Sequence, residues 1–239
     1  ERCIFVPGNH DAQCKIEAFD LRDSVDGLSP DEWVEQGEIY LVRNAERYPQ
    51  RFKRFSDALF HKFFQLPYPL DYADQGIAYL FPETHIQFLT LNSSWQIDKY
   101  NPKRSGIHPE AVAHVIKEAD SQVKSAIEKN QLKKDDKILR FGVWHHAVAG
   151  TELMSNLDFI GHLQNNNVKI CLHGDIHEMR REVIGYWHPK KMNIIASGSF
   201  GAKSEDRPES TPGLYNLLEI KRDFTSIRVH TRCQPRLDG

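Results

Sequence analysis

Short apolar runs alternate with longer amphipathic stretches through most of the chain, and this alternation predicts an α/β fold. The runs are rich in β-branched residues and bounded by polar or turn residues, as buried parallel strands are. They cover residues 3–7, 77–81, 86–92, 138–143 and 168–172. The last quarter is mostly strand-like, over residues 182–185, 192–197, 214–219 and 226–231. Strands alternate with helices in the first part of the chain, and the last part is mostly strands. This order predicts two sheets packed face to face, with helices outside.

Two segments show the three- and four-residue apolar spacing of amphipathic helices, namely residues 51–64 and 109–130, and a shorter helix is expected over residues 152–164. A further helix is expected to start at Asp31-Glu32-Trp33. Residues 12–70 are the least regular part of the chain. We expect one domain over residues 1–239, with 12–70 as a variable helical insert that either packs on the sheet or caps a site.

Charge and cysteine usage argue against several classes of partner, although they do not exclude nucleic acid bound through a local patch. The 31 Lys and Arg residues balance 33 Asp and Glu residues, so no strong field attracts nucleic acid or anionic membrane. The basic, aromatic stretch 48–55 is a local exception, and we interpret it as a solvated helix face. The four cysteines show no paired spacing, and Cys3 and Cys171 are expected in core strands. Reduced thiols predict a cytoplasmic location, and the lack of an 18-residue apolar run argues against a membrane span.

Three polar strings directly follow apolar runs, and they carry most of the chemical information. The carboxyl ends of parallel strands share one edge of a sheet, so the three strings are expected to meet there. Imidazole nitrogen suits Zn, Mn or Fe, whereas Asn and Asp oxygen favours Mn or Mg. The strings therefore predict a metal site with open positions. They are Gly8-Asn9-His10-Asp11, Trp144-His145-His146 and His173-Gly174-Asp175-Ile176-His177.

In this order the three strings resemble the signature of the calcineurin-like metallophosphoesterases. Residues 89–93, 196–201 and 215–220 also resemble strands of that family. The resemblance implies a four-layer α/β/β/α sandwich with two mixed sheets flanked by helices. It further implies a hydrolase that acts on a small phosphomonoester or phosphodiester, with a nucleotide or cyclic nucleotide among the candidate substrates.

The resemblance also implies ligand roles for four residues. Asn9, His145 and Asp175 would bind one divalent ion, and His177 would bind the second. In the family, two ions roughly 4 Å apart share a hydroxide that attacks phosphorus. Because Asp175 stands where the family has a histidine, the site carries less positive charge, and we expect Mn, with Mg, Fe or Zn as alternatives.

Three further residues receive roles toward the substrate from the same resemblance. His10 would lie beside the phosphate, where it stabilises charge or protonates the leaving oxygen. Asp11 would orient the His10 ring, and His146 would contact substrate.

Two departures from the family pattern, Asp175 and the missing first strings, leave alternatives open. The family's Asp-x-His and Gly-Asp-x-x-Asp strings do not precede Glu1, so the chain is expected to start inside the domain and to belong to a longer protein with additional domains. A permuted order, with Asp175-Ile176-His177 as the Asp-x-His string, is a second interpretation. The competing functions are a catalytically decayed regulatory or binding module and a purely structural metal site.

Overall fold

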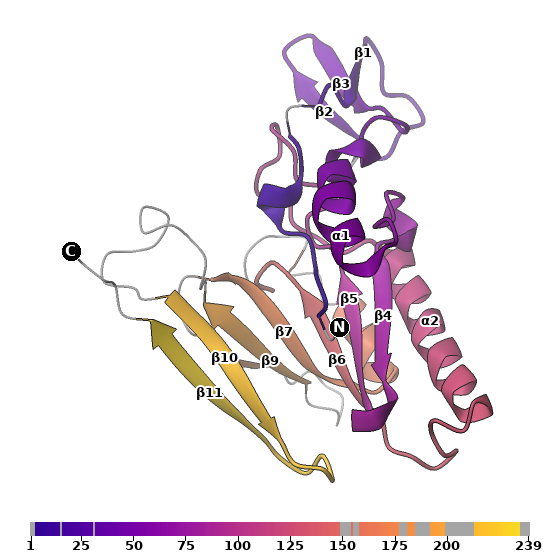
Figure 1. Ribbon diagram of the computed structural model, residues 1–239. Helices are drawn as coiled ribbons and strands as arrows, with labels where there is room; N and C mark the ends of the chain where they lie inside the picture. The colour runs from indigo at the N-terminus through magenta and orange to yellow at the C-terminus, as the bar shows by residue number, and fades with distance from the viewer. Residues whose placement is uncertain are drawn as a thin grey trace.

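A six-stranded mixed sheet, with strand order β4-β5-β6-β7-β9-β8, forms the centre of the fold (Figure 1). The computed structural model describes residues 3–14, 16–30, 32–148, 154, 158–176, 181–184, 192–198 and 213–234. Four strands run parallel, namely β5 (Ile86–Leu91), β6 (Leu139–Trp144), β7 (Val168–Ile176) and β9 (Met192–Gly198). Antiparallel strands β4 (Gly76–Phe81) and β8 (Arg181–Ile184) form its two edges. The mixed α/β architecture and these strands agree with the apolar runs.

Two helices cover one face of this sheet, α2 (Pro109–Glu128) and α4 (Asp158–Asn165). Helix α2 begins where the sequence predicts, because Pro109 occupies the first turn and Nδ1 of His108 accepts the Glu110 N–H. Its apolar stripe is buried against β4 and β5, through Ala111, Val112, Val115 and Ala119 among others. The two helices confirm the helices predicted at residues 109–130 and 152–164, although most of residues 149–157 lie outside the described part of the chain.

A β-hairpin packs on the opposite face of the sheet. Its strands are β10 (Gly213–Ile220) and β11 (Ile227–Gln234), which, among the described strands, pair only with each other. Leu218, Ile220 and Ile227 contact the cluster around Phe141 and Ile170. Successive residues of a strand point to opposite faces, so Ile170 faces the hairpin while Cys171 is buried on the helix side. The described residues therefore form three layers: helices, sheet and hairpin.

The insert contains a sheet that the sequence did not predict. Three antiparallel strands, β1 (Phe19–Arg22), β2 (Trp33–Gln36) and β3 (Ile39–Arg43), are arranged in the order β1-β3-β2. The expected helix start at Asp31-Glu32-Trp33 is wrong, since Trp33 opens β2. Gly37, at a φ of +68°, turns the chain between two β-forming runs, and this hairpin outweighs the capping pattern.

The helical part of the insert confirms the prediction for residues 51–64. It comprises a short 3₁₀ helix, η2 (Pro49–Phe52), a π-helical segment, η3 (Phe55–Phe60), and one α-helical turn, α1 (His61–Phe64). Its aromatic side chains Phe55 and Phe60 pack with Tyr68 and Ile77, which anchors the segment to β4. Figure 1 shows the insert at one end of the sheet, beyond the labels of β5 and β4.

The predicted strand at residues 3–7 is wrong: this segment belongs to no strand, and Cys3 is exposed rather than in the core. Each of the four parallel strands already has a neighbour on both sides, so the segment finds no free ladder partner there. Instead the Phe5 ring packs on Phe63 and Phe64, with ring centroids 4.8 and 5.8 Å apart. By contrast, Cys171 is buried as expected.

Side chains of α2 cover the outer edge of β4. Oε2 of Glu118 accepts the Ala78 N–H at 2.7 Å, and Nε2 of Gln122 donates to the Ala78 carbonyl at 2.7 Å. These backbone groups point away from β5 and would otherwise be open to a foreign strand. The helix therefore satisfies the outward backbone groups of Ala78 at this edge.

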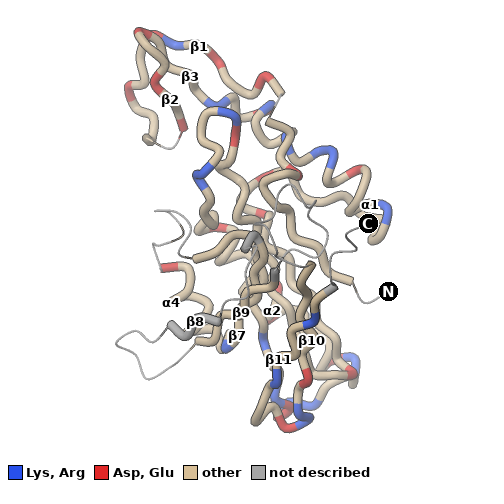
Figure 2. The backbone as a smooth tube through the Cα atoms, turned by 90° about the vertical axis from the view of Figure 1, so that its left-hand side faces the viewer, with Lys and Arg blue, Asp and Glu red and all other residues tan. Residues whose placement is uncertain are grey.

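The charged residues are interspersed in sign along the chain (Figure 2). Lys and Arg alternate with Asp and Glu in the insert and at the tip of the β10–β11 hairpin. Among the described helices, none has the length and apolar character needed to cross a membrane.

Candidate functional site

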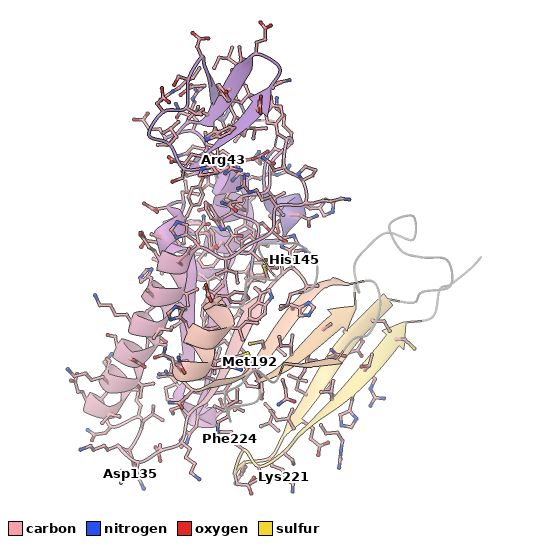
Figure 3. The ribbon with its side chains drawn as sticks, turned by 180° about the vertical axis from the view of Figure 1, so that it is seen from behind. Arg43, Asp135, His145, Met192, Lys221 and Phe224 are labelled. Atoms are coloured by element: carbon pink, nitrogen blue, oxygen red, sulfur yellow. The ribbon has the colours of Figure 1, made fainter. Side chains whose placement is uncertain are left out.

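Three segments that are distant in sequence meet at the carboxyl edge of the sheet. Asn9 lies in a single 3₁₀ turn, η1 (Asn9–Asp11), and its Oδ1 is 3.2 Å from Nε2 of His145, which directly follows β6. The Gly174 N–H, in β7, donates to the His145 carbonyl at 2.9 Å. Figure 3 shows His145 at the end of the sheet nearest the insert. Two of the predicted ligands, Asn9 and His145, are thus brought together, with the β7 string beside them.

Gly8 allows the His145 ring to approach the turn. A Cβ atom at Gly8 would lie 2.9 Å from His145 Nε2, closer than such contacts normally occur. Oδ2 of Asp11 accepts the Gly8 N–H at 2.9 Å, and the Asp11 N–H donates to the Gly8 carbonyl at 3.1 Å. Asp11 therefore closes the turn that presents Asn9. His10 is exposed, and its predicted role and that of Asp11 toward its ring stay predictions.

His146 is buried beneath the site and contacts Ser93, which follows β5. Ser93 Oγ lies 2.8 Å from His146 Nδ1 and accepts the backbone N–H groups of His145 and His146 at 3.2 and 3.1 Å. With two donors on the Ser93 oxygen, its one hydrogen is left for His146 Nδ1. The network therefore assigns Nδ1 as the acceptor. The predicted contact of His146 with substrate stays a prediction.

The other two predicted ligands fall where little can be described. Asp175 belongs to β7, but its side chain lies outside the described part of the structure, as does the whole of His177. The backbone of β7 contains an irregularity at this point. His173 pairs with Ala196 and Ile176 with Gly198, so β7 has one more residue than β9 between the two pairs. An extra residue of this kind redirects side chains at a strand end.

The distance between the two described ligand atoms, Asn9 Oδ1 and His145 Nε2, fits coordination of one shared cation. Two atoms that each lie about 2.1 Å from one ion, at tetrahedral or octahedral angles, are about 3.0 to 3.4 Å apart. The separation of 3.2 Å between Asn9 Oδ1 and His145 Nε2 falls in this range. Among the described side chains, no group of three or more His, Cys, Asp and Glu residues is placed to hold a metal. A complete ligand set therefore needs side chains beyond these two.

A buried charged cluster lies between the insert and the loop after β5. Arg51 is 1 % exposed, and Arg43 forms an ion pair with Asp98 at 3.1 Å in which the side chains are 7 % and 1 % exposed. The interpretation of residues 48–55 as a solvated helix face is therefore wrong for Arg51, although Lys53 and Arg54 are exposed. Arg51 is buried because main-chain carbonyls accept its N–H groups, and no local sequence signal announces that.

Tyr48 lies at the centre of this cluster. Its hydroxyl donates to Asp98 Oδ2 at 2.9 Å, and the guanidinium carbons of Arg51 and Arg43 lie 3.5 and 4.8 Å from its ring centroid. Burial raises the pKa of the Tyr48 phenol above its ordinary value, and the two guanidinium groups oppose this rise. Tyr48 therefore stays protonated and keeps donating to Asp98.

Sequence reasoning missed Ser93, Arg51 and Arg43 as neighbours of the site. Ser93 had a usable signal, because it directly follows the predicted strand 86–92, and the carboxyl ends of parallel strands share one edge. No sequence signal indicated the burial of Arg51 and Arg43.

Comparison with known protein families finds no family model that matches this chain, and comparison with curated proteins finds no match. The functional argument therefore depends on the residues and the geometry of this site.

Proposed function

We propose that this chain is a metal-dependent phosphoesterase domain of the calcineurin-like kind, which hydrolyses a small phosphomonoester or phosphodiester. The observation that supports it is the convergence of Asn9, His145 and the backbone of Gly174, which come from three separate polar strings, at one sheet edge. Such an edge is where open α/β sheets bind ligands. A nucleotide or cyclic nucleotide belongs to the proposed substrate class.

In this proposal Asn9 and His145 hold one divalent ion together with Asp175, and His177 contributes to a second. Mn is the proposed ion, with Mg, Fe or Zn as alternatives. When bound, the ions supply Lewis-acid chemistry that activates water and offsets phosphoryl charge. The protein does the remaining work: the Asp11 carboxylate and the backbone N–H of Gly8 fix the turn that carries Asn9, and the Ser93 hydroxyl fixes the His145–His146 backbone.

His10 and His146 are the proposed substrate contacts. His10 is exposed next to Asn9, so its imidazole is accessible to a phosphate at the site. His146 is buried and oriented by Ser93. His10 is proposed to donate a proton to the leaving oxygen, with His146 as a fixed contact.

The finer fold and the cellular setting are also proposals. Packing of the β10–β11 hairpin on the face opposite α2 supports a four-layer sandwich, of which three layers are described. The four cysteines are free thiols, which supports a reducing, cytoplasmic location.

The test compares Asn9→Ala and His145→Ala with the wild-type protein. Mn binding is measured by isothermal titration calorimetry, and turnover is measured with bis(p-nitrophenyl) phosphate. Both variants should lose Mn affinity and hydrolysis while keeping the wild-type circular dichroism spectrum. His61→Ala is the matched control, because His61 is an exposed histidine of α1 and has no proposed ligand role.

The competing functions give different results in the same assays. A decayed regulatory or binding module would bind no Mn, and neither substitution would change any activity. If the metal site is purely structural, a chelator would strongly lower the melting temperature of the protein, and the protein would hydrolyse no ester. Either result would overturn the proposal.

A further inference from the structure

Arg51 contacts both halves of the candidate site through different atoms. Its guanidinium holds the loop after β5, which begins with Asn92 and Ser93. Its backbone carbonyl accepts the Gln13 N–H at 2.9 Å, and Gln13 lies two residues beyond the turn that carries Asn9. We propose that Arg51 is a positioning residue, which fixes Ser93 and Asn9 relative to each other. The catalytic consequence of this inference rests on the proposed function.

The guanidinium of Arg51 donates to three main-chain carbonyls. Nε donates to Tyr48 at 3.0 Å, Nη2 donates to Trp95 at 2.6 Å, and Nη1 donates to Ile97. The side chain is almost fully buried, with its charged end over the Tyr48 ring. A buried cation is tolerated only when its donors are satisfied, so this position is strongly determined.

The loop that Arg51 holds is tied down on both sides of Ser93. The Ser94 N–H donates to Asn92 Oδ1 at 2.7 Å, and Asn92 Nδ2 donates to Gln75 Oε1 at 2.7 Å. On the far side, Arg43 donates to the Gln96 carbonyl at 3.3 Å. Three successive carbonyls, from residues 95 to 97, therefore accept from two arginines. Only Ser94 separates the first of them from Ser93.

Ser93 transmits this position to the histidine loop. Its Oγ accepts two consecutive N–H groups, those of His145 and His146, and is fully buried. A displacement of Ser93 would therefore move the backbone of His145, whose imidazole contacts Asn9. A misplacement of about 1 Å at a reacting centre costs up to about 100-fold in rate. Ser93 is thus the link between a buried arginine and a proposed metal ligand.

An arginine is specifically required for this role. A planar fork can reach carbonyls on two sides while its face lies on an aromatic ring, whereas an ammonium group is a single point with three donors. Lysine at position 51 would keep the positive charge but could not span Trp95 and Ile97 while stacking on Tyr48. Arg51→Lys therefore separates geometry from charge.

The experiment uses Arg51→Lys, Ser93→Ala and the double variant in the intact protein. The first readout is the ¹H–¹⁵N chemical shift of the His145 and His146 amides, which reports their hydrogen bonds to Ser93 without metal or substrate. The second is Mn affinity, and the third is kcat/KM with bis(p-nitrophenyl) phosphate. Arg47→Lys is the control, because Arg47 belongs to the same segment but pairs with Asp20 on the surface.

If Arg51 acts through Ser93, Arg51→Lys shifts both histidine amide signals toward those of Ser93→Ala. It also weakens Mn binding and kcat/KM, each by on the order of 10-fold, and the double variant loses much less than the product of the single losses. Arg47→Lys leaves all three readouts unchanged. Unchanged amide signals in a folded Arg51→Lys protein, or fully multiplicative losses, would overturn the inference.

A second variant keeps the test decisive if Arg51→Lys does not fold. Gln13→Pro removes the N–H that the Arg51 carbonyl accepts, and Gln13→Ala, which keeps this N–H, controls for the lost side chain. The preceding residue, Ala12, has an extended ψ of 117° that accommodates a following proline. Gln13→Pro should weaken Mn binding through Asn9 while leaving the His145 and His146 amide signals unchanged. Unaltered Mn affinity would count against the inference. Absence of Mn binding and hydrolysis in the wild-type protein would instead count against the proposed function, and the amide shifts would still test the link from Arg51 to Ser93.

Discussion

Asn9 Oδ1 and His145 Nε2 lie 3.2 Å apart, although 136 positions separate the two residues in the sequence. This contact holds the turn after an extended segment against the loop after β6. A metal ion bound here would replace the hydrogen bond, since both atoms would direct lone pairs toward the ion. The pair is therefore arranged so that little movement is needed on binding.

Gly8→Ala is expected to displace His145. The new methyl carbon would lie 2.9 Å from Nε2, so the ring must move away from Asn9. We expect Mn affinity to fall by 10-fold or more, measured by calorimetry, with little change in melting temperature. Gly174→Ala is the comparison, because its methyl would meet His145 Nδ1 at 3.6 Å, an ordinary contact, and its effect should be several-fold smaller. Equal losses in both variants would contradict the steric explanation.

Two ion pairs of the insert should differ widely in their contribution to stability. Arg43–Asp98 is buried, whereas the side chains of Arg47 and Asp20 are 45 % and 40 % exposed. Asp98→Ala leaves an unpaired buried guanidinium and should lower the free energy of unfolding by about 3–5 kcal/mol. Asp20→Ala should cost no more than about 1 kcal/mol. Urea denaturation of both variants measures the difference, and similar losses would refute it.

The outer edge of β4 should become prone to aggregation when α2 no longer covers it. Glu118→Ala combined with Gln122→Ala leaves the Ala78 N–H and carbonyl without their partners. We expect increased light scattering on mild heating, before global unfolding. Lys117→Ala combined with Lys124→Ala changes two exposed residues of the same helix and is the control. Scattering that rises equally in both double variants would argue against edge protection.

The four thiols should react at very different rates with iodoacetamide. Cys3 and Cys233 are exposed, whereas Cys171 is buried with its Sγ 3.2 Å from Met192 Sδ. Burial raises the pKa of the Cys171 thiol well above its usual range, so the group stays protonated, and the reagent cannot reach it in the folded protein. Mass spectrometry should find Cys3 and Cys233 modified first and Cys171 only after denaturation. Early labelling of Cys171 would mean that the helix-side core opens.

Acid should remove a small stabilising contribution from the β10–β11 hairpin. The hydrogen bond from His230 and the nearby Arg228 guanidinium hold the pKa of Glu219 below its ordinary value. A carboxyl group whose pKa is lower in the folded state than in the unfolded state stabilises the fold at pH values above its unfolded pKa. This stabilisation is lost as the pH falls through the pKa of the folded state. Glu219→Gln should therefore melt below wild type at neutral pH and equal to it in strong acid. A difference independent of pH would contradict this assignment.

The sequence predicted the elements whose apolar period is strong and whose partners are near in the chain. Helix α2 and strands β4 and β5 follow directly from spacing, capping and a proline turn. The segment at residues 3–7 has the same local pattern as a strand, but whether a strand forms depends on a free neighbour, which local sequence does not specify. Likewise, the choice between helix and hairpin at Trp33 depended on Gly37 and on pairing with β3.

The site was predictable as far as strand ends determine position. His145 lies at the carboxyl edge of the sheet because it directly follows the parallel strand β6, as predicted, whereas Asn9 reaches the same edge from a segment that forms no strand. Arg51 was not predictable, because its burial depends on carbonyl acceptors in a loop 44 and 46 positions away. A guanidinium satisfied by main-chain oxygen leaves no complementary acid in the sequence to reveal it.

The long separation between Asn9 and His145 also has a consequence for protein synthesis. The amide side chain leaves the ribosome more than a hundred residues before the imidazole that it contacts, so the turn is held at first by its local bonds between Gly8 and Asp11 and by the contact of Gln13 with Arg51. The proposed ion site is incomplete in every nascent chain that ends before His145. Binding of a cation at this site would therefore have to follow the synthesis of β6.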